Sequence, residues 1–279
     1  MKRVFIPIIL WYLRLGARIQ IKKTNPTIIG VGGSSGKSSL TRLIAGILKD
    51  HFVISATQEK NSETGIPLHI LNIHFDFSYS KWFETLFLVP LRLLFYWPKY
   101  QFLLAEMGID SPVEPKNMSY LLKIIQPTIG VITNITAEHS VYFDPYIKET
   151  DEKIRKKKVL EMTTEQEILL LTSLPANGVA VVNLDDESIA TFSTKIKARQ
   201  ITISTKLSSA TLFGQEILLT SEYFSMEIVY KGNAYRLVIS QPLPSHFSYE
   251  FLCAVGVALS CGLSIQEAVE SVEKNFSLP

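Results

Sequence analysis

The chain has 279 residues, of which 47% are hydrophobic and 19% are charged, so it can bury the core of one large domain or of two small ones. Its formal net charge of +2 gives no strong attraction to nucleic acid or anionic lipid, which excludes a strongly basic nucleic-acid-binding class. Both cysteines lie in one apolar segment and are expected to be core residues in a reducing compartment.

Residues 4–15 form an apolar stretch interrupted by one arginine, and basic residues follow it. The stretch has no small-residue cleavage site and is shorter than the about 20 apolar residues that span a bilayer. Two interpretations stay open: a helix at a membrane interface, with Trp11 and Tyr12 at the headgroups, or a helix packed on the domain. Residues 1–25 are expected to form this apolar and basic N-terminal helix.

A glycine-rich stretch at 30–39 follows the apolar run 27–29 and precedes a segment with helical apolar spacing at 40–49. Strand, glycine-rich turn and helix are the context of a phosphate-binding loop, because glycines let backbone N–H groups converge on an anion at a helix N-terminus. Lys37 is placed to reach the outer phosphates, and the Ser38 hydroxyl to ligate Mg²⁺. Val31 stands where the common pattern G-x-x-x-x-G-K-[ST] has its first glycine.

The segments after this helix predict a strand at 51–55, a polar turn at 61–68 and a strongly apolar, aromatic stretch at 81–100. Pro90 and Pro98 are expected to break or kink a helix there. Its charged residues and prolines argue against a membrane span, so a buried or membrane-surface helical excursion is expected.

Two later apolar runs end in residues with the chemistry of metal and phosphate sites. The run 101–105 ends in Glu106, and the run 128–133 leads to His139. Taken alone, Glu106 fits a surface charge and His139 a loop histidine. Because α/β sheets bind ligands at the carboxyl ends of parallel strands, their position after a phosphate loop favours metal and phosphate chemistry.

The remaining segments predict helices and strands in turn: 118–125 (helix), 148–158 (solvated helix face), 178–183 and 197–204 (strands), and 249–261 and 265–275 (helices). Residues 210–240 alternate apolar and polar side chains around a Lys-Gly-Asn turn, which predicts antiparallel strands. The predicted fold class is α/β: a P-loop domain with a mostly parallel sheet flanked by helices and a small antiparallel region near 210–240.

Five segments carry a family resemblance in their order and spacing: 33–39 (G-[ST]-x-G-K-[ST]-[ST]), 61–68 (N-x-x-x-G-x-P-L), 104–108 (LE[LM]G), 131–139 (ITNI…H) and 174–186 (LP-x-x-G…N-x-DD). They resemble the Mur ligase family, with the nearest likeness to its UDP-N-acetylmuramoyl-tripeptide:D-alanyl-D-alanine ligase branch. The resemblance covers 26–279, which would be the central ATP-binding domain, and the family's N-terminal UDP-binding and C-terminal domains are expected to be absent.

The resemblance implies an ATP-dependent ligase that joins a carboxylate to an amine through an acyl phosphate, in cytoplasmic peptidoglycan precursor synthesis. ATP and Mg²⁺ would be its cofactors. Its partners would be a carboxylate substrate such as a UDP-muramyl peptide and an amino acid or dipeptide. Independently of the resemblance, the apolar stretches 4–15 and 82–97 suggest a peripheral membrane contact.

The resemblance also implies roles for individual residues. Lys37 would hold the β- and γ-phosphates, Ser38 one Mg²⁺, and Glu106 with His139 a second Mg²⁺ that bridges the γ-phosphate and the substrate carboxylate. The other nucleotide contacts would come from Gly33, Ser34, Ser35, Gly36, Ser39, Asn134, Asn183, Asp185 and His246.

Two residue-level departures from the family leave alternatives open. The carbamylated lysine of the family aligns with Glu167, whose carboxylate could imitate the carbamate; alternatively Lys153 or Lys158 serves. The motif GxHNxxN appears at 244–250 with His246 but without either asparagine. The competing hypotheses are an ATP-binding module without ligase activity of its own and a peripheral membrane scaffold.

Overall fold

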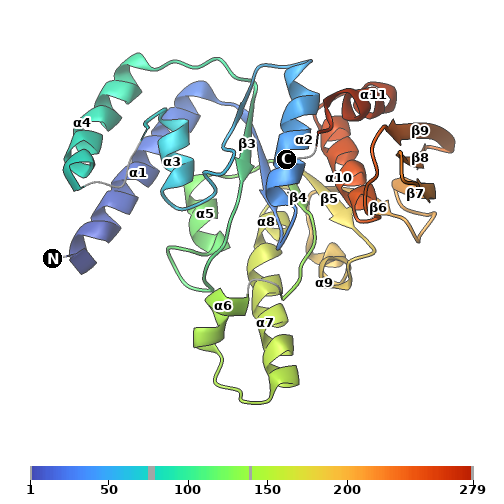
Figure 1. The fold of residues 1–279 in the computed structure, drawn as a ribbon. Helices are drawn as coiled ribbons and strands as arrows, with labels where there is room; N and C mark the ends of the chain where they lie inside the picture. The colour runs from blue at the N-terminus through green and yellow to red at the C-terminus, as the bar shows by residue number, and fades with distance from the viewer. Residues whose placement is uncertain (1, 75–78, 138–139, 278–279) are drawn as a thin grey trace.

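The computed structural model describes residues 2–74, 79–137 and 140–277. Within them, nine strands form one sheet in the order β2-β3-β1-β4-β5-β6-β7-β8-β9, with helices on both faces (Figure 1). Every pairing from β2 to β7 is parallel, and β8 pairs antiparallel with β7 and β9. The predicted fold class is confirmed, including the antiparallel region.

The strands are β1 (Thr27–Gly32), β2 (Ile54–Ala56), β3 (Phe102–Glu106), β4 (Ile129–Ile132), β5 (Val179–Asn183), β6 (Arg199–Ser204), β7 (Leu212–Leu219), β8 (Phe224–Tyr230) and β9 (Asn233–Ile239). The α-helices are α1 (Lys2–Thr24), α2 (Lys37–Lys49), α3 (Gly65–Ile70), α4 (Tyr79–Phe95), α5 (Met118–Ile124), α6 (Ser140–Phe143), α7 (Glu152–Glu167), α8 (Leu169–Thr172), α9 (Glu187–Ala190), α10 (Phe247–Ser260) and α11 (Ile265–Asn275). Short 3₁₀ helices lie at Asp144–Tyr146 and Ser193–Lys195.

The central strands are apolar on both faces, as expected for a parallel sheet covered on both sides. In β1, Ile29 and Val31 belong to the core cluster that α2, α10 and α11 complete. Ile28, which precedes Ile29, belongs to the opposite cluster, which α1, α5 and α8 complete. The period of two along a strand thus divides one apolar run between two cores.

The strand register brings three carboxyl ends to one place. Val31 of β1 lies beside Glu106 of β3 on one side and beside Val131 of β4 on the other. The chain after β1 builds β2 and β3 on one side and then crosses to β4 on the other, so β1 lies at a point where the strand order reverses. Ligands of open α/β sheets bind at such points.

The N-terminal segment is a helix that packs on the domain. Leu10, Leu13 and Ala17 of α1 are buried, and α1 lies beside α3, α4 and α5 at one end of the sheet (Figure 1). The helix packed on the domain, one of the two sequence interpretations, is therefore confirmed for this face of α1. None of the helices in the described ranges is both long enough and apolar enough to cross a bilayer.

Two local predictions were imprecise. The strand predicted at 51–55 begins only at Ile54, because the N–H groups of His51 and Phe52 bond to the Leu48 carbonyl and extend the end of α2. Of the two outcomes predicted for Pro90, a break or a kink, the structure excludes the break, because Pro90 lies inside α4. Val89 beside it is buried against α1, and this tertiary contact stabilises the helix across the proline.

Candidate active site

The turn between β1 and α2 depends on two glycines with left-handed backbone conformations. Gly33 has φ 121° and Gly36 has φ 75°, values that favour glycine. A Cβ on Gly33 would lie 2.1 Å from Thr133 Oγ1, so the missing side chain also provides space. The turn leads directly into α2, whose first N–H groups have no partners within the helix and can bind an anion.

The segment after β4 braces this loop. The Ser34 N–H donates to the Asn134 carbonyl (2.9 Å), and the Ser35 N–H donates to Asn134 Oδ1 (3.1 Å). Thr133 Oγ1 donates to the Ser35 carbonyl (2.6 Å), and the Thr136 N–H donates to Ser34 Oγ (2.9 Å). Asn134, expected near the nucleotide, therefore holds the backbone of the loop in its shape.

Lys37 folds over the loop that precedes it. Its Nζ donates to the Gly33 carbonyl (2.6 Å) and to the Ser34 carbonyl (3.2 Å). The ammonium group is thus held beside the backbone that would surround a phosphate, and rotation of its long side chain can redirect it toward a bound anion.

Ser38, Asn61 and Glu106 meet at the carboxyl end of β3. Glu106 is 1% exposed, and its Oε1 accepts hydrogen bonds from Ser38 Oγ (2.8 Å) and Asn61 Nδ2 (3.1 Å). Its Oε2 is buried and has no hydrogen-bond partner among the described residues. Because a buried carboxylate oxygen without a partner is costly, this atom is suited to ligate a cation.

The oxygen atoms of this cluster fit Mg²⁺. A serine hydroxyl and a carboxylate are ligands that Mg²⁺ accepts, and Mg²⁺ commonly fills its other positions with water and substrate phosphates. Within the described ranges, no group of three or more His, Cys, Asp or Glu side chains could hold a metal ion. His139, the other predicted ligand, lies outside the described residues.

Glu167 approaches the phosphate loop from the end of α7. It is 1% exposed, and its Oε2 accepts a hydrogen bond from the Gly33 N–H (2.9 Å). Burial raises the pKa of Glu167 to about 7, against the opposing effects of the Lys37 charge and the Gly33 hydrogen bond. The carboxyl group expected to imitate a carbamate therefore lies directly against the first glycine of the loop.

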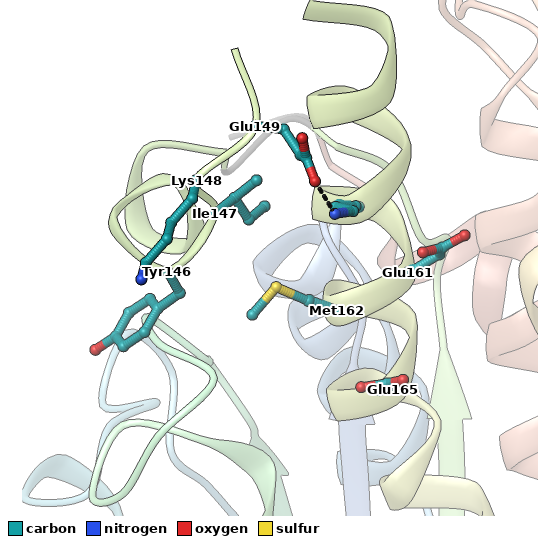
Figure 2. Close-up of a pocket in the computed structure, with 8 residues that line it drawn as sticks. Tyr146, Ile147, Lys148, Glu149, Glu161, Met162 and Glu165 are labelled. Atoms are coloured by element: carbon teal, nitrogen blue, oxygen red, sulfur yellow. Dashed lines mark hydrogen bonds and ion pairs between the residues drawn. The ribbon is translucent and has the colours of Figure 1, made fainter. Parts of the chain in front are cut away.

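The two alternative lysines lie further along α7. Lys153 is exposed, and Lys158 forms an ion pair with Glu149 (dashed line in Figure 2). This pair borders a cavity of about 410 Å³ between α7 and the segment 146–149, into which Met162 points (Figure 2). Of the three candidates, Glu167 alone contacts the phosphate loop in the described part of the chain.

The tip of β5 is a hydrogen-bonded junction. Asn183 Oδ1 accepts from the Asp185 N–H (3.0 Å), and the Asp185 carboxylate accepts from Ser204 Oγ, the Thr205 N–H (2.7 Å) and Tyr249 OH (3.1 Å). Burial acts to raise the pKa of Asp185, but these hydrogen bonds outweigh it, and the pKa lies below its ordinary value. The Asp185 carboxylate is thus occupied in joining β5, β6 and α10.

At the start of α10, two residues differ in placement. His246 is exposed and stacks on Phe247, with ring centroids 4.8 Å apart. Glu250 is buried, and its Oε1 lies 3.1 Å from the position that a Cβ on Gly36 would take. Burial raises the pKa of Glu250, while a hydrogen bond with Ser39 and the Arg42 charge oppose the rise. A carboxyl group therefore stands where the family motif has an asparagine.

The structure brings most predicted residues to one edge of the sheet but leaves His246 exposed beside it. Sequence reasoning missed Asn61 as a site residue, together with Asp186, whose Oδ2 accepts from the Ile135 N–H (2.9 Å), and Glu250. Asn61 follows the tip of β2, which is the signal that could have identified it. Asp186 and Glu250 also carried a signal, because they end the family-like segments 174–186 and 244–250.

A phosphate loop at a reversal of strand order, with a serine and a buried carboxylate beside it, defines a P-loop nucleotide-binding α/β domain. A family model for the Mur ligase middle domain matches residues 31–258. The chain therefore belongs to the Mur ligase family, and the resemblance found in the sequence is confirmed.

Relatives with known names agree on the family. The chain is 26% identical over 245 residues to a UDP-N-acetylmuramoyl-tripeptide--D-alanyl-D-alanine ligase of Buchnera aphidicola, covering 88% of this chain and 44% of the relative. It is 29% identical over 150 residues to a UDP-N-acetylmuramate--L-alanine ligase of Aquifex aeolicus, covering 54% of this chain and 30% of the relative. The chain thus spans less than half of the length of these relatives.

The fold is also shared with solved structures. The MurF ligase of Thermotoga maritima in complex with ADP superposes with a TM-score of 0.73 at 17% identity, over 97% of this chain and 53% of that one. A pseudomurein peptide ligase type C of Methanothermus fervidus superposes with a TM-score of 0.61 at 14% identity, over 92% of this chain and 50% of that one. At these identities the likeness establishes the fold.

Proposed function

We propose that this chain is the ATP-binding core of a Mur-type ligase, an enzyme that joins a carboxylate to an amine at the expense of ATP. Residues 26–279 would form this central domain, and residues 1–25 its N-terminal helix. The observation that carries the proposal is the meeting of Ser38 with the buried Glu106 beside the Lys37 loop. One oxygen of Glu106 has no hydrogen-bond partner among the described residues.

In phosphoryl transfer, the protein contributes mainly by positioning the reactants and neutralising charge. Lys37 and the N–H groups that begin α2 would hold the β- and γ-phosphates, since the N–H groups of Gly33, Ser34 and Ser35 donate to Glu167 and Asn134. Ser38 and Glu106 would hold Mg²⁺, which supplies neutralisation of the charge that develops on the transferred phosphoryl group. Glu167 fixes the Gly33 N–H, so it positions the loop, and His139 remains a proposed ligand. The carboxylate substrate would attack the γ-phosphorus of ATP, which releases ADP and gives an acyl phosphate. The amine would then attack the acyl carbon and displace inorganic phosphate, which leaves the amide.

For substrates we propose a UDP-muramyl peptide as the carboxylate and an amino acid or dipeptide as the amine, in cytoplasmic peptidoglycan precursor synthesis. The names of the Buchnera and Aquifex relatives support this choice. The substitution of Glu250 for a motif asparagine favours the alternative, an ATP-binding module that lacks ligase activity by itself.

The test is ADP release by the full chain with UDP-N-acetylmuramoyl-tripeptide and D-alanyl-D-alanine, beside equilibrium binding of ATP with and without Mg²⁺. We expect Lys37→Ala to lose ATP binding and turnover, and Glu222→Gln, which changes an exposed glutamate in another turn, to keep both. Tight ATP binding with no ADP release would favour the module without activity. Equal ATP binding by Lys37→Ala and the unmodified chain would contradict the proposal.

A peripheral membrane contact is a second proposal, separate from the ligase reaction. It is supported by the exposed apolar side chains that α1 keeps on the face turned away from the core, among them Trp11 at 53% exposure. Fractionation of cells that produce the full chain is its test. We expect the chain in the membrane fraction and its release by high salt, and recovery in the soluble fraction at low salt would contradict the contact.

A further inference from the structure

Two helices at one end of the molecule leave apolar stripes uncovered. On α1, exposed apolar side chains recur every three or four residues, which places them on one face: Ile8, Trp11, Leu15 and Ile19. The buried residues Leu10, Leu13 and Ala17 lie on the opposite face of the helix. Packing against the domain core therefore accounts for the apolar side chains on one face of α1 but not for those on the other face.

Helix α4 repeats the pattern more strongly. Its exposed stripe consists of Phe87, Leu91, Leu94 and Phe95, and Trp97 follows the end of the helix. Phe87 is 73% exposed and Phe95 is 78% exposed, whereas Val89 on the other side is 1% exposed. Large aromatic side chains this exposed mark an interaction surface when they gather on one patch.

The two helices form one unit. Tyr12 OH of α1 donates to the Leu86 carbonyl of α4 (2.8 Å), and Lys23 Nζ donates to the carbonyls of Leu93 (2.8 Å) and Tyr96 (2.6 Å). Tyr12, expected at the headgroups, is thus held in the contact between the helices. Figure 1 places both helices at the edge of the molecule, away from α10 and α11. We call the two stripes together with Trp97 the α1–α4 surface.

Charge indicates what covers this surface. Helix α1 carries basic residues and no acidic ones: Lys2, Arg3, Arg14, Arg18, Lys22 and Lys23. The whole chain has a net charge of only +2, so positive charge is concentrated on this helix. Arg18 and Lys22 are exposed, like the apolar stripe that they adjoin. A second copy would bring like charges together, whereas an anionic lipid surface matches both the charge and the apolar stripe.

We propose that the α1–α4 surface docks in the interface of an anionic lipid bilayer, with the aromatic side chains among the acyl chains and the basic side chains at the headgroups. This docking rests on the peripheral membrane contact proposed above, and it specifies the surface of the chain and the kind of lipid that form the contact. It does not depend on ligase activity. An interfacial position agrees with the finding that none of the described helices is suited to cross a bilayer.

The experiment is flotation of the purified full chain with phosphatidylcholine vesicles and with vesicles that also contain phosphatidylglycerol. We expect binding to the anionic vesicles to be about tenfold tighter or more, and to weaken with salt. The variant Phe87→Glu/Phe95→Glu should lose binding to both, and Arg18→Glu/Lys22→Glu should lose the preference for anionic lipid. The matched control is Val53→Glu/Leu218→Glu, which places the same charges at exposed apolar positions elsewhere and should bind normally.

Equal flotation of Phe87→Glu/Phe95→Glu and the control would overturn the proposal. So would a dimer of the unmodified chain that this variant converts to monomers, because the surface would then bind a second copy. ATP binding, measured in parallel, separates the membrane contact from the proposed ATP-binding function. Lys37→Ala should float with the vesicles as the unmodified chain does, although it no longer binds ATP. Membrane association in cells that survives the Phe87→Glu/Phe95→Glu change would leave the membrane contact standing and remove this surface as its cause.

Discussion

Two buried carboxyl groups with different neighbours govern the site at the residue scale. Glu106 accepts hydrogen bonds from Ser38 and Asn61, and its other oxygen has no partner in the described part of the chain. Glu167 instead accepts from a backbone N–H and lies near the Lys37 charge. The first arrangement fits a metal ligand, and the second fits a group that positions the loop.

The change Glu106→Gln tests the first role. Glutamine keeps the shape but removes the charge that a hard cation requires, so the gain in ATP affinity on adding Mg²⁺ should fall by about tenfold or more. ATP affinity without Mg²⁺ should be unchanged or higher, because a negative charge near the phosphates is lost. Titration calorimetry with and without Mg²⁺ measures both values. An unchanged Mg²⁺ effect would remove Glu106 as a ligand.

The change Glu167→Gln tests the second role through pH. Since the folded pKa of Glu167 is raised to about 7, the folded state binds this proton more tightly than the unfolded state does. The resulting stability is fully present below the ordinary pKa of glutamate and is lost as pH rises to about 7. Across that window the unmodified chain should lose up to about 3 kcal/mol relative to the variant. Urea unfolding at several pH values measures it, and parallel curves would contradict the buried, protonated carboxyl group.

At the element scale, the phosphate loop is a turn whose shape is fixed by contacts on two sides. The segment after β4 holds Ser34 and Ser35, and Glu167 at the end of α7 holds Gly33. The backbone of the loop is therefore held in one shape before a ligand binds, which lowers the cost of ordering it.

Two glycines with positive φ, one in the phosphate loop and one in a distant turn, provide matched substitutions that test the role of the loop. Gly33→Ala should cost about 3 kcal/mol or more and abolish ATP binding, because strain adds to the contact with Thr133. Gly232, in the β8–β9 turn, has φ 80°, and no atom of the described residues lies within 4 Å of a Cβ added there. Gly232→Ala should therefore cost only about 1–2 kcal/mol. Thermal unfolding and ATP titration report the two effects. Equal losses would show that backbone strain alone, without the Thr133 contact, sets the cost.

At the scale of the whole molecule, α1 is packed against the domain and is not a separate appendage. Leu13 is fully buried among residues of α3 and α4, and Lys23 bonds to the end of α4. The N-terminal helix is therefore part of the folded unit on one side while its other side carries the α1–α4 surface.

This double character predicts opposite outcomes for two neighbouring leucines. Leu13→Ala should destabilise the chain by about 2–5 kcal/mol, as expected for a buried leucine. Leu15→Ala, 41% exposed, should leave stability within about 0.5 kcal/mol and weaken only vesicle binding. Chemical denaturation and flotation measure the two properties. A stable Leu13→Ala chain would mean that α1 adds nothing to the core.

The sequence by itself determined the phosphate loop, the class of fold and most elements, because glycine conformations and apolar periodicity are local properties of the chain. It also placed Glu106 at a strand tip. Only the tertiary structure decided which groups meet: Glu106 lies 68 positions from Ser38, and Glu167 lies 134 positions from Gly33. The same holds for α1 and α4, whose packing separates a buried face from an exposed one. Such pairings depend on strand register and helix packing, which no local pattern records.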